Sequence, residues 1–307
     1  MVYILGIDGG GSKTEAAIID DNDRVIGCSV AGGSNTNFVE RSEAVKSFVT
    51  AIKGALEEAG LQPSQIVGAG CTFGGVASDA FAEIGLCVKP VGVSESRVAF
   101  ERAGLERMYG VALIAGTGSS CFGFGPEGQR FHAGGHGPLL GDEGGGYDIG
   151  IRGARIALQS YEGRKPPTML IQAACEYFDV PNIRLLVHKL AGSCIRQTLI
   201  AGFAARVSDC ARRGDQLASE ILQYAGSVLG ELVAFVASRV FSSDDEFPVV
   251  MAGGVFKAGD LVIEPLKSVV SAQFPKSRFI VGHMSPGEAV ARITKRVLQH
   301  REGFERC

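Results

Sequence analysis

Short apolar runs alternate with glycine-rich or polar turns at the start of the chain. The runs Val2–Ile7 and Thr14–Asp20 predict two strands joined by the glycines between them, and Val25–Val30 predicts a third strand. Over Arg41–Ala59 apolar residues recur at helical spacing, and Gly60 follows as a residue suited to end a helix. This pattern indicates a small sheet covered by a helix.

The alternation continues through the first third of the chain. Ile66–Thr72 and Cys87–Val93 predict two further strands, and between them lie a Gly74–Gly75 turn and a short helix around Ser78–Ile84. The region therefore has α/β character.

A second version of the opening pattern begins near residue 111. The predicted strand Val111–Ala115, the glycine turn GTGSS and the returning strand Cys121–Phe124 repeat the order strand, hairpin, strand. The repetition suggests an internal duplication, with one copy in each of two domains.

Helical periodicity dominates residues 149–235, and the chain then returns to strands. We predict strands at Phe247–Ala252 and Arg278–Val281 and a closing helix at Pro286–Gln299. A chain of 307 residues is long enough for two domains. We expect α/β domains at residues 1–112 and 113–307, the second with a helical insertion.

Composition narrows the classes of function. The hydrophobic fraction is 46%, the charged fraction is 21% and the net charge is −3, as in ordinary globular proteins. Nucleic acid and anionic membranes need a concentrated basic face, for which this charge gives no support. We therefore expect a small-molecule partner, with no nucleic acid and no membrane.

The eight cysteines are scattered without a CxxC pair, and most stand in apolar runs. Buried reduced thiols in a reducing compartment fit this better than disulfides or zinc. The opening MVYILGIDGGG has no basic region and too short an apolar run for a secretory or membrane segment. We expect a cytoplasmic protein.

The segment IDGGGSKT at Ile7–Thr14 is the first candidate for chemistry. A dinucleotide fingerprint would need a helix directly after the glycines, and a P-loop would need its lysine directly after the last glycine; neither condition is met. A tight hairpin whose backbone N–H groups point at phosphate oxygens fits better, with Asp8 placed to hold hydrated magnesium. A plain glycine turn is the alternative.

The segment AGTGSS at Ala115–Ser120 strengthens the phosphate interpretation. A second glycine hairpin after a buried strand could hold the phosphates from the other side, with Thr117, Ser119 and Ser120 as hydroxyl donors.

Six motifs in order resemble one family. They are IDGGGSKT, GGSNTN at Gly32–Asn37, AGTGSS, GGHGPLLGDEGG at Gly134–Gly145, RRGD at Arg212–Asp215 and MAGGVF at Met251–Phe256. Over nearly its whole length the chain resembles the acetate and sugar kinase, Hsp70 and actin superfamily. Within it, the resemblance is to the N-acetylglucosamine kinases and the BadF/BadG/BcrA/BcrD ATPases.

The resemblance implies two ribonuclease-H-like domains around a central nucleotide and sugar cleft, the actin-like ATPase fold. It also implies ATP and Mg²⁺ as cofactors, an amino sugar as substrate and a homodimer. The implied metal residue is Asp8. The implied nucleotide residues are Gly10, Gly11, Ser12, Lys13, Thr14, Thr117, Gly118, Gly214, Ala252, Gly253, Gly254 and Lys257. For Gly214, Gly253 and Gly254, the alternative is that they are helix-capping glycines.

Substrate residues follow from the same comparison. Those implied are Asn35, Thr36, Gly74, Gly75, Gly135, His136 and Asp142. Asn35 would bind sugar hydroxyls because an amide donates and accepts in one plane, or it would be a turn residue. Asp142 would also bind sugar hydroxyls, and Gly135 and His136 would line the N-acyl pocket unless His136 is an exposed loop residue.

The catalytic base departs from the family pattern. Where the family has an aspartate after its fourth strand, this chain has Ser94-Glu95-Ser96-Arg97, so Glu95 takes that place. The extra methylene displaces the carboxylate, and we expect the neighbouring Arg97 to lower its pKa and weaken it as a base. The alternative is that Glu95 is a solvated loop residue and that the chain is a weak or altered kinase.

Three functions remain open at this point. The first is ATP-dependent phosphorylation of the primary hydroxyl of an amino sugar, most simply N-acetylglucosamine, with glucosamine close behind. The second is a non-kinase ATPase that activates benzoyl-CoA or 2-hydroxyacyl-CoA dehydratases, for which no suitable cluster cysteine is evident. The third is a sugar-sensing regulatory protein with weak transfer or none.

Overall fold

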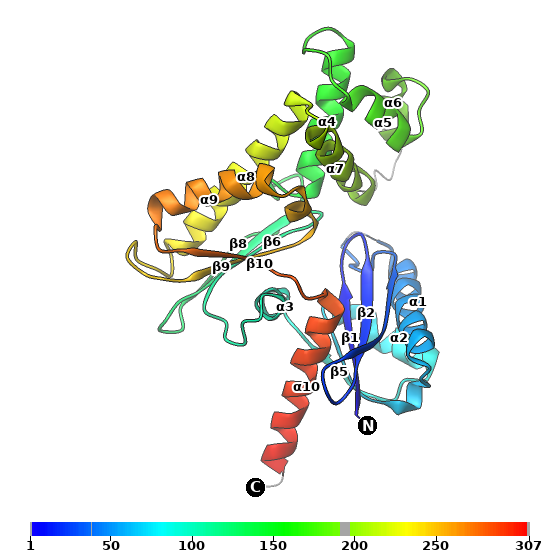
Figure 1. The fold of residues 1–307 in the computed structure, drawn as a ribbon. Coiled ribbons are helices and arrows are strands. Elements are labelled where there is room, and N and C mark those ends of the chain that lie inside the picture. Colours follow the sequence, from blue (N-terminus) through cyan, green and yellow to red (C-terminus); the bar gives the residue numbers. More distant parts are fainter. Residues whose placement is uncertain (1, 38, 191–196, 306–307) are drawn as a thin grey trace. The chain divides into compact units, whose positions relative to one another are not determined.

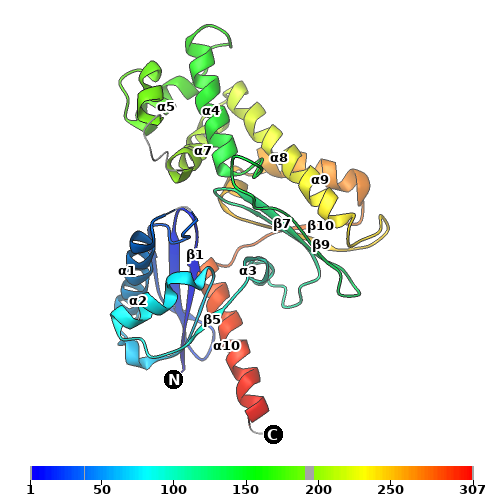
Figure 2. The ribbon, with the colours of Figure 1, turned by 180° about the vertical axis from the view of Figure 1, so that it is seen from behind.

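The computed structural model describes residues 2–37, 39–190 and 197–305. The chain forms two compact units: unit 1 comprises Met1–Glu106 and Gly282–Cys307, and unit 2 comprises Arg107–Val281. Each unit contains one five-stranded sheet with helices packed on it (Figures 1 and 2). The predicted α/β class with two domains is confirmed, and the cleft between them stays a prediction.

The sheet of unit 1 has the order β3-β2-β1-β4-β5. Its strands are β1 (Tyr3–Gly9), β2 (Thr14–Ile19), β3 (Val25–Ala31), β4 (Ile66–Cys71) and β5 (Pro90–Gly92). The first three form an antiparallel meander, whereas β4 lies parallel to β1 and β5 parallel to β4. The carboxyl ends of β1, β4 and β5 therefore share one edge of the sheet.

Helices cover both faces of this sheet (Figure 1). On one face, α1 (Arg41–Ala59) and α2 (Ala77–Ile84) pack on a core that includes Leu5 and Ile7. On the other face, α10 (Pro286–Glu305) packs against Ile4 and Ile19, and α3 (Glu95–Arg102) lies beside it. Short 3₁₀ turns at Pro63–Gln65 and Gly74–Val76 precede β4 and α2.

The sheet of unit 2 repeats this topology. Its strands are β6 (Gly110–Ala115), β7 (Ser119–Phe124), β8 (Arg130–Gly134), β9 (Pro248–Ala252) and β10 (Arg278–Val281), in the order β10-β9-β6-β7-β8. An antiparallel meander is again followed by two strands parallel to the first. The shared topology agrees with the predicted internal duplication.

The helices of unit 2 fall into two groups (Figure 2). The pair α8 (Gln216–Ala237) and α9 (Asp260–Gln273) packs on the sheet. The helical insertion consists of α4 (Gly146–Tyr161), α5 (Leu170–Phe178), a 3₁₀ turn at Ile183–Leu185, α6 (Leu186–Leu190) and α7 (Gln197–Arg212). A second 3₁₀ turn, at Gly254–Ala258, follows β9. Among the described residues, only α8 is long and apolar enough to cross a membrane, and 56% of its apolar window is buried inside the protein.

The chain is divided differently from the predicted 1–112 and 113–307. The first unit ends at Glu106, and the closing helix α10, which we expected in the second domain, belongs to unit 1. Gly6 shows why: a Cβ there would lie 2.2 Å from the Gly287 carbonyl oxygen and the Ala291 nitrogen. The glycine lets α10 lie directly on β1.

Smaller differences concern local elements. Strand β8 was not predicted, β5 is only three residues long, and Glu95 begins a helix. The thiols are less buried than expected, since Cys28 and Cys87 are exposed. Cys194 and Cys307, and the predicted helical residues 191–196, lie outside the described residues.

Candidate active site

The first glycine hairpin occupies residues 10–13, between β1 and β2. The Gly10 N–H donates to the Lys13 carbonyl (2.8 Å), and the Gly10 carbonyl accepts from the backbone N–H groups of Ser34 (2.9 Å) and Asn35 (3.1 Å). A Cβ on Gly33 would lie 2.2 Å from the Gly11 carbonyl oxygen, so only glycine allows this approach. The predicted sugar loop and the predicted phosphate hairpin are thus packed together.

Thr14 has a different place from the one predicted. Its side chain is fully buried, and its hydroxyl lies 2.8 Å from the Gly32 carbonyl oxygen and 2.7 Å from Ser34 Oγ. A hydroxyl engaged in this way stabilises the contact between hairpin and loop rather than reaching a phosphate. Gly10, Gly11 and Ser12 remain the residues of the hairpin that could approach one.

Asp8 stands at the end of β1, beside a residue that the sequence prediction missed. Thr72, fully buried directly after β4, donates its hydroxyl to Asp8 Oδ1 (2.8 Å) and accepts from the Gly9 N–H (2.9 Å). Burial raises the pKa of Asp8, and the Thr72 hydrogen bond partly offsets this. A polar residue ending a strand parallel to β1 was the signal that could have identified Thr72.

Glu95 is half-buried in the first turn of α3, just beyond the carboxyl end of β5. Burial, together with the negative charge of Asp8, raises its pKa to about 7. The two carboxylates are therefore electrostatic neighbours at one edge of the sheet. A carboxylate with a pKa near neutrality is suited to general base catalysis.

The expected effect of Arg97 on Glu95 is wrong. The Arg97 guanidinium donates to the Glu106 carbonyl and lies 4.0 Å from the Glu101 carboxylate. A residue two positions further along a helix points to a different side, so adjacency in sequence did not bring the cation to Glu95. The pKa of Glu95 is raised, not lowered.

Lys13 is half-exposed at the hairpin and forms a 3.0 Å ion pair with Glu15 on β2. The buried Glu15 carboxylate also accepts from the backbone N–H of Gly287, at the start of α10 (3.1 Å). Although burial alone would raise the pKa of Glu15, the contacts with Lys13, Gly287 and Ser285 lower it. The hairpin lysine is thus held by a stable anion.

The second hairpin, in unit 2, is built against the start of α4. The N–H groups of Gly146 and Tyr147 donate to the carbonyls of Gly116 (2.8 Å) and Thr117 (2.9 Å). The first-turn donors of α4, which helices leave unpaired, are therefore used to fix the hairpin. On its other side, a Cβ on Gly253 would lie 2.1 Å from the Ala115 carbonyl oxygen, so the turn at 252–254 adjoins the hairpin.

Asp142 lies beneath the same hairpin. It adopts a left-handed backbone conformation (φ 62°), its side chain is buried, and a Cβ on Gly118 would lie 2.0 Å from Oδ2. Burial raises the pKa of Asp142, and the backbone N–H groups of Gly137 and Gly135 partly offset this. Within the described residues, Oδ1 is buried without a hydrogen-bond partner, as expected of a group that awaits a polar ligand.

The remaining predicted substrate residues are less enclosed. Asn35 is buried and its Oδ1 accepts from the Asn37 N–H (3.0 Å), which is a turn interaction that leaves the amide NH₂ for a ligand. Thr36, Gly74, Gly75, Gly135 and His136 are exposed. Asn35, Thr36, Gly74 and Gly75 belong to unit 1, whereas Gly135, His136 and Asp142 belong to unit 2.

The predicted adenosine residues differ in their local structure. Gly214 has a φ of 91° and follows the last turn of α7, as a helix-ending glycine does, while Asp215 caps α8. Gly254 and Lys257 are exposed in the 3₁₀ turn that follows β9. Ala252 is buried at the end of that strand.

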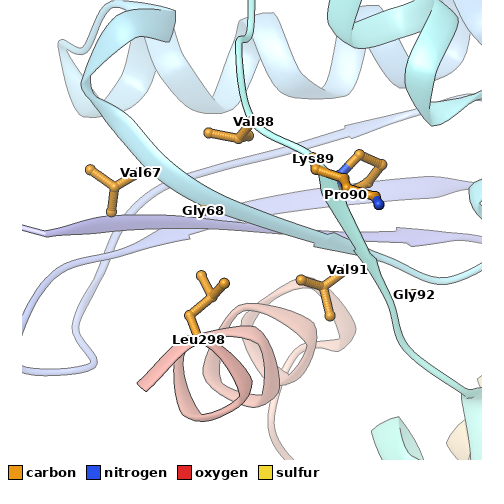
Figure 3. Close-up of a pocket in the computed structure, with 8 residues that line it drawn as sticks. All are labelled: Val67, Gly68, Val88, Lys89, Pro90, Val91, Gly92 and Leu298. Atoms are coloured by element: carbon orange, nitrogen blue, oxygen red, sulfur yellow. The ribbon is translucent and has the colours of Figure 1, made fainter. Parts of the chain in front are cut away.

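A cavity of about 460 Å³ lies beside β4, β5 and α10 in unit 1 (Figure 3). It is lined by Val67, Gly68, Val88, Lys89, Pro90, Val91, Gly92 and Leu298. These residues come from the start of β4, from β5 and the two residues before it, and from α10. None of the predicted site residues lines this cavity.

Two sheets of this topology, each with a glycine hairpin after its first strand, define an actin-like ATPase fold. The fold resembles that of a ROK family glucokinase from Streptomyces griseus in complex with glucose and AMPPNP, with a TM-score of 0.64, 16% identity and coverage of 96% of this chain and 99% of that one. Residues 5–288 match the family model, and the chain belongs to the BadF/BadG/BcrA/BcrD ATPase family.

Two curated relatives align over most of their lengths. The N-acetylmuramic acid/N-acetylglucosamine kinase of Clostridium acetobutylicum is 28% identical over 91% of this chain and 94% of its own. The N-acetyl-D-glucosamine kinase of Dictyostelium discoideum is 25% identical over 94% of this chain and 96% of its own.

Proposed function

We propose that this chain is an ATP-dependent kinase that phosphorylates the primary hydroxyl of an amino sugar, with N-acetylglucosamine as the first candidate. The observation that carries the proposal is the pair of carboxylates Asp8 and Glu95 at the carboxyl edge of one sheet, with the pKa of Glu95 at about 7. The names of both curated relatives include N-acetylglucosamine, which supports the choice of substrate.

The residues around the first hairpin fit a magnesium–nucleotide complex. Thr72 occupies Asp8 Oδ1, which leaves the second oxygen for a water of a hydrated ion. Among the described residues, no group of three or more His, Cys, Asp or Glu side chains could form a metal cage. Mg²⁺ characteristically keeps several waters and binds through one or two carboxylates and substrate phosphates. When bound, it would neutralise charge on the phosphates.

Glu95 is the proposed catalytic base. Its carboxylate would accept the proton of the sugar's primary hydroxyl as that oxygen forms a bond to the γ-phosphorus and the bond to the ADP oxygen breaks. The transferred proton stays on Glu95 until product release. The residues Gly10, Gly11, Ser12, Lys13, Thr117 and Gly118 would hold the phosphates, and Gly214, Ala252, Gly253, Gly254 and Lys257 the adenosine.

The residues proposed to recognise the sugar stand in three segments. They are Asn35 and Thr36, Gly74 and Gly75, and Gly135, His136 and Asp142. The buried, unpartnered Oδ1 of Asp142 supports this, because an acceptor left unpaired in a buried site gains most from a hydroxyl donor. The cytoplasmic location expected from the sequence, and the homodimer that the resemblance implies, belong to the same proposal.

The test is ADP release over a panel of N-acetylglucosamine, glucosamine, N-acetylmuramic acid and glucose. The wild type should release ADP with at least one amino sugar, and Glu95→Gln should lower kcat at least about 100-fold with little change in KM. Glu83→Gln, an exposed glutamate on α2, is the control and should behave as the wild type.

Other outcomes would contradict the proposal in distinct ways. Full turnover by Glu95→Gln would remove Glu95 from the role of base. Sugar binding by calorimetry without any ADP release would identify a sensor instead of a kinase. Sugar-independent ATP hydrolysis by an iron-containing protein would identify a dehydratase activator.

A further inference from the structure

Arg102, the last residue of α3, makes three hydrogen bonds to the segment with which the chain re-enters unit 1. Its Nε donates to the Met284 carbonyl (2.7 Å). Its own carbonyl accepts from the backbone N–H groups of His283 (3.0 Å) and Met284 (3.3 Å). A Cβ on Gly282 would lie 3.0 Å from Arg102 Cβ, so the two stretches are in close contact.

The re-entry segment, residues 283–287, is held on its other side by Glu15. The Gly287 N–H donates to Glu15 Oε1 at 3.1 Å, and Ser285 also hydrogen-bonds this carboxylate. Glu15 in turn binds Lys13 of the phosphate hairpin. The segment therefore connects Arg102 to the hairpin.

The guanidinium of Arg102 also belongs to the electrostatic environment of the site. Burial lowers the pKa of Arg102, whereas the negative charges of Asp8 and Glu15 act in the opposite direction. Asp8 and Glu95 are electrostatic neighbours, as are Asp8 and Glu15. Asp8, Glu15 and Glu95 thus contribute negative charge at this edge of the sheet, and Arg102 and Lys13 contribute the positive charge that acts on Asp8.

A magnesium–ATP complex carries a net negative charge of about two at neutral pH. A site with three carboxylates would repel it, and opposite charges within the site reduce that cost. Lys13 is half-exposed, and its charge is already paired with Glu15 at 3.0 Å. Arg102 is half-buried and tied to the backbone of Met284, so its charge is fixed in position.

We propose that Arg102 is a positioning residue of the phosphate site. Its guanidinium, held by residues 283–287, supplies the fixed positive charge that allows the carboxylate-rich site to accept Mg·ATP. The inference rests on the nucleotide site of the proposed function and is independent of the sugar.

The test is the Kd for Mg·AMPPNP, measured by calorimetry without sugar. Arg102→Gln keeps a donor for the Met284 carbonyl but removes the charge, and it should weaken binding about tenfold, which is about 1.4 kcal/mol. Arg102→Lys restores the charge and should stay within about threefold of the wild type.

Arg296→Gln is the matched control. Arg296 on α10 pairs with Glu101, the residue beside Arg102, so its loss removes a partly buried ion pair of the same unit. It should lower the melting temperature and leave the Kd for Mg·AMPPNP unchanged. If Arg102→Gln likewise lowered the melting temperature and left the Kd for Mg·AMPPNP unchanged, the role of Arg102 would be purely structural and the inference would be overturned.

A measurement on the wild type covers the case in which Arg102→Gln does not fold. Addition of Mg·AMPPNP should slow hydrogen exchange at the backbone amides of residues 283–287 as well as at the hairpin. Slower exchange at the hairpin alone would overturn the proposed link. Absence of Mg·AMPPNP binding by the wild type would refute the proposed nucleotide site itself. Binding by the wild type with no effect of Arg102→Gln on the Kd would refute only the role of Arg102.

Discussion

Glu95, which departs from the family's aspartate by one methylene, stands on a regular element. It begins α3 with Ser94 as N-cap, so its carboxylate is carried by a regular element rather than by a mobile loop. Its high pKa comes from burial beside Asp8, and no cation of its own helix offsets this. The residue differs from the family's aspartate in length but has the proton affinity that a base requires.

The raised pKa of Glu95 predicts a pH-dependent stability. A carboxyl group whose pKa rises on folding stabilises the folded state fully below its unfolded pKa of about 4.5, and this contribution is lost as pH rises through about 7. Glu95→Gln has no carboxyl group to titrate, so it does not lose this stability. The unfolding free energy of Glu95→Gln minus that of the wild type should therefore be higher at pH 8 than at pH 4.5, by on the order of 2 kcal/mol.

Thermal unfolding of both proteins without ligands at pH 4.5, 6 and 8 measures this difference. Glu83→Gln should follow the wild type at every pH, because its carboxylate is exposed. Parallel pH curves for the wild type and Glu95→Gln would show that Glu95 titrates as an ordinary surface glutamate.

Thr72 is expected to matter for both stability and activity. Thr72→Val keeps the shape but leaves the Gly9 N–H unpaired and removes a donor from Asp8. We expect a loss of about 1–3 kcal/mol in unfolding free energy and a lower kcat. Chemical denaturation measures the stability, and the ADP-release assay measures kcat. Thr50→Val is the control: the Thr50 hydroxyl donates to the Lys46 carbonyl in the preceding helical turn at an exposed position. Its loss should lower the unfolding free energy by less than about 0.5 kcal/mol.

At the scale of elements, each glycine hairpin is supported by a neighbour that is distant in sequence. The first rests on the loop at residues 32–35, and the second rests on the start of α4 and on Asp142. The hydrophobic runs predicted the strands that flank both hairpins. They could not predict these supports, because backbone hydrogen bonds between loops leave no periodic signal.

The close contact between Gly118 of the second hairpin and Asp142 can be tested by substitution. In Gly118→Ala the new methyl would lie 2.0 Å from Asp142 Oδ2, so the hairpin or the acidic loop must move. We expect the Kd for Mg·AMPPNP to rise more than about tenfold. Gly92→Ala, where the added methyl meets nothing within 4 Å, is the control and should bind as the wild type does. Equal affinities in the two variants would mean that the hairpin can adapt.

At the scale of the whole molecule, unit 1 is completed by the end of the chain. The buried residues Ala289, Ala291 and Ile293 of α10 close the face of the sheet that α1 leaves uncovered. Residues 1–106 alone would expose that apolar face to water.

A chain shortened at Val281 should therefore lose the fold of unit 1 and keep that of unit 2. Limited proteolysis should leave a resistant fragment close to residues 107–281, and the circular dichroism signal should fall accordingly. A chain shortened at Gln299 retains the buried positions of α10 and should resist proteolysis as the full chain does. Equal resistance of the chain ending at Val281 would show that unit 1 folds without α10.

Sequence by itself determined the strands, the two hairpins, the α/β class and the order of motifs that marks the family. These features rest on local patterns, namely period, glycine content and spacing, which are written along the chain. Tertiary structure decided which sheet received α10, where the Arg97 charge lies, that Thr14 is buried and that Thr72 binds Asp8. Each of these depends on residues brought together from distant parts of the chain, and the burial that raises the pKa of Glu95 exists only once they have met.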